Sequence, residues 1–193
     1  GYPDVHNIFV MGGSDTAEHA VRLMPPDMHA KIFEMDYERA QHLTERIGRR
    51  AMIVNGDGRD LELLQDENIN SAQAFLALTG NSESNILACL AAKRLGVRKT
   101  VAMIENSDYI GMAESLDIGC IINKKTFAAS HIYQMMLKAD ITSIKTLTIA
   151  AADVVEIKVA EGTRVTRHPI KDLGLPATVN LGGLVRNGKA TLI

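Results

Sequence analysis

The chain has 193 residues, of which 46% are hydrophobic, 23% charged and 4% aromatic, a composition typical of a water-soluble globular protein. Its formal net charge of -2 argues against a dedicated nucleic-acid-binding protein, which is usually clearly basic. No apolar run approaches the roughly 18 to 20 residues that span a bilayer, and the first residues lack a signal-peptide layout. The two cysteines have neither metal-binding nor redox-motif spacing. We expect a soluble, cytosolic protein of one domain, or of one domain with a small appendage.

Short apolar runs recur through the first two thirds of the chain at intervals of about 20 residues. These runs are residues 7–11, 30–34, 51–54, 74–78, 100–104 and 119–122. Continuous apolar runs of this length are typical of strands that are buried on both faces of a parallel sheet.

Segments with helical spacing of apolar residues separate these runs. These segments are residues 17–24, 40–47, 61–64, 86–95 and 112–116. The glycines at positions 48 and 96 are expected to end two of the helices. Regular alternation of strand and helix predicts an α/β protein with a doubly wound parallel sheet.

The pattern changes after residue 122. Residues 125–139 are predicted to form a longer amphipathic helix, and its apolar side would carry Phe127, Ile132, Met135, Met136 and Ala139. The segments expected beyond it are strands at 144–149 and 154–159, a helical turn at 169–173, and strands at 178–185 and 189–193. The last two flank Arg186-Asn187-Gly188, a strong hairpin signal. The last third is therefore predicted to be a small α+β lobe.

In a doubly wound sheet, ligands bind beyond the carboxyl ends of the strands, where the strand order reverses. The first such loop reads G-x-S-x-x-A over Gly12–Ala17, against the dinucleotide-binding pattern G-x-G-x-x-G/A. Ser14 adds a side chain where a phosphate would approach, and Asp15 places a competing carboxylate at the helix N-terminus. The loop is therefore equally consistent with a phosphate site and with a plain strand–helix turn.

Carboxylates end the next two predicted strands. Glu34 follows Gly12 by 22 residues, which is the spacing of the acidic residue that binds a ribose diol; the alternative is an exposed acid. Asp57 lies between two glycines, where it can face an adenosine group, or the loop is a simple turn with Asp60 as a helix cap. Asp36 is expected to be the N-cap of the following helix.

The fourth loop, residues 78–85, consists of small polar residues and opens a helix whose free N–H groups can bind an anion. No catalytic set is evident in the sequence, because the six histidines are scattered and no nucleophile elbow or P-loop occurs. Cys89, on a helix, and Cys120, in a strand, are each expected to be buried core residues.

Three segments resemble the regulator-of-potassium-conductance (RCK or KTN) domain of bacterial Trk potassium uptake systems. They are ALTGNSESNILACLAAKRLGVRK at 77–99, VNGDGRD at 54–60 and EMDYERA at 34–40. The resemblance covers about residues 5–193. It implies a Rossmann-type doubly wound parallel sheet over 5–123, a crossover helix over 124–140 and a partial C-terminal lobe over 141–193. Because that lobe normally continues further, the chain is expected to be a fragment of a larger subunit.

The resemblance also implies a function without catalysis. Such domains regulate a membrane potassium transporter or channel, here a partner of the TrkH/TrkG type, from the cytoplasmic face of the membrane. They bind NAD(H) or an adenine nucleotide (ATP, ADP or AMP) and pair through their crossover helices into dimers and then a tetrameric ring, with no role for nucleic acid. The positions implied to bind the nucleotide are Gly12, Gly13, Ser14, Asp15, Thr16, Glu34, Met35, Asp57, Gly58, Thr79, Gly80 and Asn81.

The chain departs from the family at two positions, since the family often has glycine at position 14 and a basic residue at position 15. Ser14 and Asp15 replace a phosphate-attracting loop with a repelling one. The alternatives are a scaffold module that binds no nucleotide and an NAD-dependent oxidoreductase, which the missing acid–base pair opposes. The apolar face of the predicted crossover helix likewise either pairs with a second copy or covers its own sheet.

Overall fold

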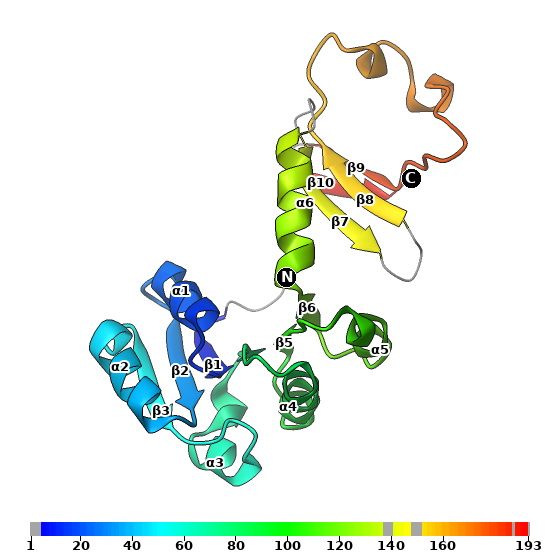
Figure 1. The fold of residues 1–193 in the computed structure, drawn as a ribbon. Coiled ribbons are helices and arrows are strands. Elements are labelled where there is room, and N and C mark those ends of the chain that lie inside the picture. The colour runs from blue at the N-terminus through cyan, green and yellow to red at the C-terminus, as the bar shows by residue number, and fades with distance from the viewer. Residues whose placement is uncertain (1–4, 137–140, 148–151, 187, 193) are drawn as a thin grey trace.

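The computed structural model describes residues 5–136, 141–147, 152–186 and 188–192. Its main body is a parallel six-stranded sheet with the order β3-β2-β1-β4-β5-β6. The strands are β1 (Asn7–Met11), β2 (His29–Glu34), β3 (Ala51–Asn55), β4 (Ala74–Ala77), β5 (Lys99–Met103) and β6 (Cys120–Ile122). This is the strand order of a Rossmann fold, in which the direction of winding reverses between β1 and β4. The predicted doubly wound sheet is confirmed (Figure 1).

Helices cover both faces of the sheet. They are α1 (Asp15–Leu23), α2 (Tyr37–Ile47), α3 (Leu61–Asp66), α4 (Ser82–Arg94) and α5 (Ile110–Ser115), with short 3₁₀ turns η1 (Ile69–Ser71) and η2 (Ser107–Tyr109). Ile8 and Val10 of β1 enter a core shared with α1 and α2. Phe9 and Met11, which point to the opposite face, enter a second core shared with α3, α4 and α5. Both faces of the strands are therefore buried, which explains the uninterrupted apolar runs.

Side-chain caps begin the helices that follow the first four strands. Asp36 accepts a hydrogen bond from the backbone N–H of Arg39, and Asp60 accepts from those of Glu62 and Leu63. The predicted caps at these two positions are confirmed. Because each cap lies within five residues of the end of a strand, the helix N-termini gather at the carboxyl edge of the sheet.

Asn123 joins the last strand of the sheet to α6 (Lys124–Met136). Its buried amide donates to the Ile104 carbonyl over 2.7 Å, and its side-chain oxygen accepts from the Thr126 N–H over 3.0 Å. Lys124 adds an ion pair of 3.2 Å with Glu105. One side chain thus caps α6 and binds it to the segment that follows β5, while the rest of the helix extends away from the sheet (Figure 1).

The apolar residues of α6 are exposed. Phe127, Ile132, Tyr133, Met135 and Met136 have between 53% and 77% of their surface exposed. The interpretation that this face covers the domain's own sheet is therefore wrong, because the helix leaves the sheet after its first turn. The end of the predicted helix, including Ala139, lies outside the described residues.

The C-terminal lobe contains two antiparallel hairpins, as expected for an α+β unit. The first pairs β7 (Ile141–Leu147) with β8 (Ala152–Ile157), and the second pairs β9 (Gly183–Arg186) with β10 (Lys189–Leu192). Two 3₁₀ turns, η3 (Arg164–Thr166) and η4 (Ile170–Asp172), lie between the hairpins, and η4 confirms the predicted helical turn. The strand predicted at 178–185 is wrong in its first part, where the Val179 N–H donates to the Pro176 carbonyl in a turn.

Within the described residues, no helix is long and apolar enough to cross a bilayer.

The two cysteines differ in their surroundings. Cys89 is fully buried on α4, and burial raises the pKa of its thiol to about 12. Cys120 is exposed, so its predicted burial is wrong. The reason is its position on β6, an outer strand of the sheet, which pairs only with β5 among the residues that the structure describes.

The two thiols are expected to react very differently with iodoacetamide at pH 8. Cys120 should be alkylated in the folded protein, whereas Cys89 should react only after unfolding, since the thiolate is the reactive species. Mass spectrometry of digests with and without urea would measure this, with Cys120→Ser as the control that removes the fast reaction.

Because folding raises the Cys89 pKa above its ordinary value of 9.0, the free energy of unfolding should also fall as the pH rises from 9 towards 12. Alkylation of both thiols at equal rates would contradict the burial of Cys89.

Candidate functional site

A cleft of about 730 Å³ lies at the carboxyl ends of β1, β2 and β4. It is at the point where the strand order reverses, as expected for a ligand site in this fold. Eleven of the twelve positions predicted to bind a nucleotide line it: Gly12, Gly13, Ser14, Asp15, Glu34, Met35, Asp57, Gly58, Thr79, Gly80 and Asn81. Thr16 is half-buried within α1 and does not line the cleft.

Gly12 lies at the base of the cleft, between β1 and the end of β4. It has a φ of +94°, which L side chains rarely adopt, and its N–H donates to the Phe33 carbonyl over 2.9 Å. A Cβ at this position would lie 2.8 Å from Thr79 Cγ2 and 3.2 Å from Thr79 Cα. The backbone conformation and the close approach of Thr79 both require glycine.

Glu34 places its carboxylate beside the glycine loop. Its Oε2 accepts from the Gly13 N–H over 2.7 Å, and its Oε1 accepts from the Asp36 N–H over 2.9 Å. Each carboxylate oxygen can accept a further hydrogen bond. The side chain is therefore fixed in position and keeps capacity for ligand hydroxyl groups.

At the start of α1, Ser14 caps the helix, whereas the side chain of Asp15 extends into solvent. Ser14 is the N-cap, and its Oγ accepts from the Ala17 N–H over 3.3 Å. It therefore satisfies one of the N–H groups that an anion would contact. The Asp15 side chain is 90% exposed, and its carboxylate lies 3.6 Å from Arg39 Nη2 of α2.

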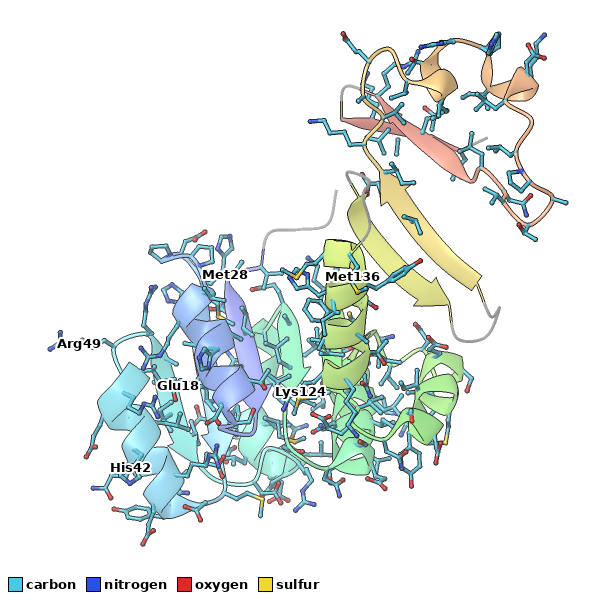
Figure 2. The ribbon with its side chains drawn as sticks, turned by 45° about the horizontal axis from the view of Figure 1, so that its top comes forward. Glu18, Met28, His42, Arg49, Lys124 and Met136 are labelled. Atoms are coloured by element: carbon cyan, nitrogen blue, oxygen red, sulfur yellow. The ribbon has the colours of Figure 1, made fainter. Side chains whose placement is uncertain are left out.

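Helix α2 contributes three basic side chains to the cleft that the sequence reasoning did not single out. Arg39, His42 and Arg46 all line it, and their spacing of three and four residues places them on one helix face. Arg39 Nε donates to the Gly13 carbonyl over 2.7 Å. This spacing, directly after the predicted ribose-binding acid, was the sequence signal that could have revealed them. Figure 2 labels His42 on α2 and Glu18 on α1.

Glu18 is a buried acid between α1 and α2. Its side chain is only 5% exposed, and it accepts from Arg22 over 2.7 Å and lies 3.1 Å from Arg46. Burial of a carboxylate is costly unless cations compensate it. The ion pair with Glu18 therefore holds Arg46 at the cleft wall, and the positive charge of Arg46 offsets the cost of burying the Glu18 carboxylate.

Asp57 and Arg59 form a close pair on the far side of the cleft. Arg59 donates to the carboxylate through Nη2 over 2.8 Å and through Nε over 3.0 Å. The side-chain hydrogen bond from Arg59 holds the pKa of Asp57 below its ordinary value. Asp57 is therefore ionised at neutral pH, and much of its accepting capacity is used within its own loop.

Asn85 holds the β4 end of the cleft in place; it ends the predicted fourth loop but was not among the twelve predicted nucleotide-binding positions. Its Oδ1 accepts from Thr79 Oγ1 over 2.6 Å, and its Nδ2 donates to the carbonyls of Thr79 and Met103 over 2.9 and 2.7 Å. The residue is fully buried. One side chain on α4 therefore joins the ends of β4 and β5 and sets the position of Thr79.

The position of this cleft is that of the ligand site in a Rossmann fold, and a known protein family matches the same part of the chain. Residues 8–124, which contain the six-stranded sheet except Asn7, match the TrkA-N domain. The chain belongs to the TrkA-N domain family.

The relatives of this TrkA-N domain include proteins named Trk system potassium uptake protein TrkA. The chain is 30% identical over 190 residues to the Trk system potassium uptake protein TrkA of Vibrio alginolyticus, which covers 96% of the chain and 41% of that protein. It is also 30% identical over 183 residues to TrkA of Haemophilus influenzae, covering 93% of the chain and 40% of that protein. The chain thus spans about two fifths of the length of these relatives.

Solved structures share the fold at low identity. The TrkA-N domain of the inner membrane protein YbaL from Escherichia coli has a TM-score of 0.59 at 15% identity, over 69% of this chain and 98% of that one. The GsuK channel bound to NAD has a TM-score of 0.57 at 16% identity, over 76% of this chain and 26% of that one. The Kef CTD of Shewanella denitrificans in its AMP-bound form has a TM-score of 0.51 at 15% identity, over 66% and 77%.

Proposed function

We propose that this TrkA-N domain is a regulatory, non-catalytic module of a potassium uptake system, which binds NAD(H) or an adenine nucleotide and couples that binding to ion flux. The observation that carries the proposal is the cleft at the reversal of strand order, where Gly12, Glu34 and Asp57 come together. The relatives named potassium uptake proteins support the transport role, and the neighbours bound to NAD and AMP support the ligand class.

The nucleotide would lie across the carboxyl edge of the sheet. Its phosphate would approach the bare backbone of Gly12 and Gly13, and its ribose hydroxyls would donate to Glu34. The adenine would lie towards Met35 and Asp57. A ribose 2′-phosphate would meet the Glu34 carboxylate, so NAD(H) is expected to bind in preference to NADP(H).

Nucleotide binding at this edge of the sheet would be coupled to the position of α6. Asn123 and Lys124 bind the start of α6 to the backbone and side chain at the end of β5. A ligand can shift the arrangement of α6 only by the difference in its affinity for two arrangements. We propose that the whole subunit lies at the cytoplasmic face of the membrane, beside a membrane subunit of the TrkH/TrkG type.

Isothermal titration calorimetry with NAD, NADH, AMP, ADP and ATP tests the ligand proposal. Binding by the wild type that is weakened in Gly80→Ala would support it, because Gly80 lines the cleft and an added Cβ would meet no protein atom within 4 Å, so the fold is expected to be kept. Gly111→Ala is the matched control, since Gly111 is outside the cleft and also has no atom within 4 Å. Absence of heat from a folded protein would favour a scaffold module instead, and turnover of NADH with small substrates would favour an oxidoreductase.

The exposed apolar face of α6 is proposed to form a homodimer, from which a tetrameric ring would assemble. Replacing Phe127 and Met135 together by Glu is expected to convert a dimer to a monomer, because four charges would meet in an apolar contact. Sedimentation velocity would measure the change. Leu23→Glu is the control, since Leu23 is 85% exposed on α1 and lies on another element. Equal sedimentation of the wild type and the double variant would contradict the α6 interface.

A further inference from the structure

The glycine loop of this cleft contains no cation of its own. The segment Gly12–Ala17 carries Asp15 as its one charged side chain, and a carboxylate repels a phosphate. A nucleotide phosphate bound at this loop therefore requires positive charge from another element. The cleft offers that charge from α2, through Arg39 and Arg46, and from the loop after β3, through Arg59.

These three arginines differ in how firmly they are already engaged. Arg46 lies 3.1 Å from the buried Glu18, and withdrawing it would remove one of two compensating charges. Arg59 donates three side-chain hydrogen bonds of 2.8 to 3.1 Å to Asp57. Both have well-formed partners that a ligand would have to replace.

Arg39 is the arginine whose charged end is least engaged. Its Nε is fixed to the Gly13 carbonyl over 2.7 Å, which holds the guanidinium against the glycine loop. Its Nη2 has a distant ionic contact of 3.6 Å with Asp15, whose side chain is 90% exposed. A charge-assisted hydrogen bond to phosphate is normally about 2.7 to 2.9 Å long, so a phosphate would be a better partner than this carboxylate.

We infer that Arg39 is the phosphate-binding cation of this cleft and that Asp15 is a built-in competitor, whose carboxylate lies near Arg39 Nη2 until a nucleotide phosphate takes its place. The inference rests on the proposed function, since it concerns the same cleft. It assigns to α2 the charge that the loop after β1 does not provide. It also makes Asp15 a residue that lowers the affinity for phosphate.

The test compares adenosine with ADP, so that binding of the nucleoside is separated from binding of the phosphates. Arg39→Gln is expected to weaken ADP binding about 10- to 100-fold and to leave adenosine binding within about twofold. Arg39→Lys keeps the charge and should restore part of the ADP affinity. Asp15→Asn should tighten ADP binding about two- to fivefold, which is the range of an exposed ionic contact. Thermal unfolding of each variant shows that the fold is retained.

Arg49→Gln is the matched control, because it removes the same charge from a side chain that points away from the domain (Figure 2). ADP binding that is weakened equally by Arg39→Gln and Arg49→Gln would overturn the role of Arg39 while leaving nucleotide binding standing. Equal loss of adenosine and ADP in Arg39→Gln would assign Arg39 a structural role and also overturn the inference. A wild-type protein that binds neither adenosine nor ADP would overturn the proposed ligand function itself, and with it this inference.

Discussion

Gly12→Ala is expected to abolish nucleotide binding and to lower the free energy of unfolding by roughly 2 to 5 kcal/mol. The alanine would have to adopt a φ of +94°, and its Cβ would lie 2.8 Å from Thr79 Cγ2. The Thr79 backbone is also close, with N and Cα both at 3.2 Å, so rotation of the Thr79 side chain alone cannot relieve the contact. The loop after β1 and the end of β4 would separate, which would open the base of the cleft.

Urea denaturation would measure the loss of stability in Gly12→Ala, and calorimetry would measure the loss of binding. Gly111→Ala is again the control, because its added Cβ meets no atom within 4 Å and alanine favours a helix by about 0.5 to 1 kcal/mol. A Gly12→Ala protein as stable as the wild type would show that the loop does not hold this conformation in solution.

Asn85→Ala is expected to be the most destabilising change at the cleft that leaves glycine conformation untouched, at about 3 kcal/mol or more. The substitution leaves the N–H and hydroxyl of Thr79 and the carbonyls of Thr79 and Met103 without their side-chain partner. These groups lie around a fully buried position, where loss of a partner costs the full desolvation of the group. Because Thr79 is released, nucleotide affinity should fall as well.

Chemical denaturation monitored by circular dichroism would check this value. Asn70→Ala is a suitable control, since Asn70 is exposed in η1, and it should change stability by less than about 0.5 kcal/mol. An equal decrease in the free energy of unfolding in Asn85→Ala and Asn70→Ala would show that the hydrogen bonds of the Asn85 amide do not stabilise the cleft.

Much of the fold was predictable because it depends on near neighbours in the chain. The apolar run of β1 is continuous because adjacent residues such as Val10 and Met11 enter separate cores on opposite faces of the sheet. The caps at Asp36 and Asp60 are likewise contacts within three residues. Eleven of the twelve predicted site positions line one cleft, because parallel strands bring their carboxyl ends to the same edge.

The sequence by itself therefore determined the succession of strands and helices along the chain, the position of the glycine loop and the acids at the strand ends. Only the tertiary structure decided which side chains meet across the cleft. The contact between Arg39 and Gly13 joins positions 26 residues apart, and that between Asn85 and Met103 joins positions 18 apart. The exposure of Cys120 and of the α6 apolar face followed from what packs beside each element. Contacts of this kind depend on how distant elements pack, which a local pattern of residues does not encode.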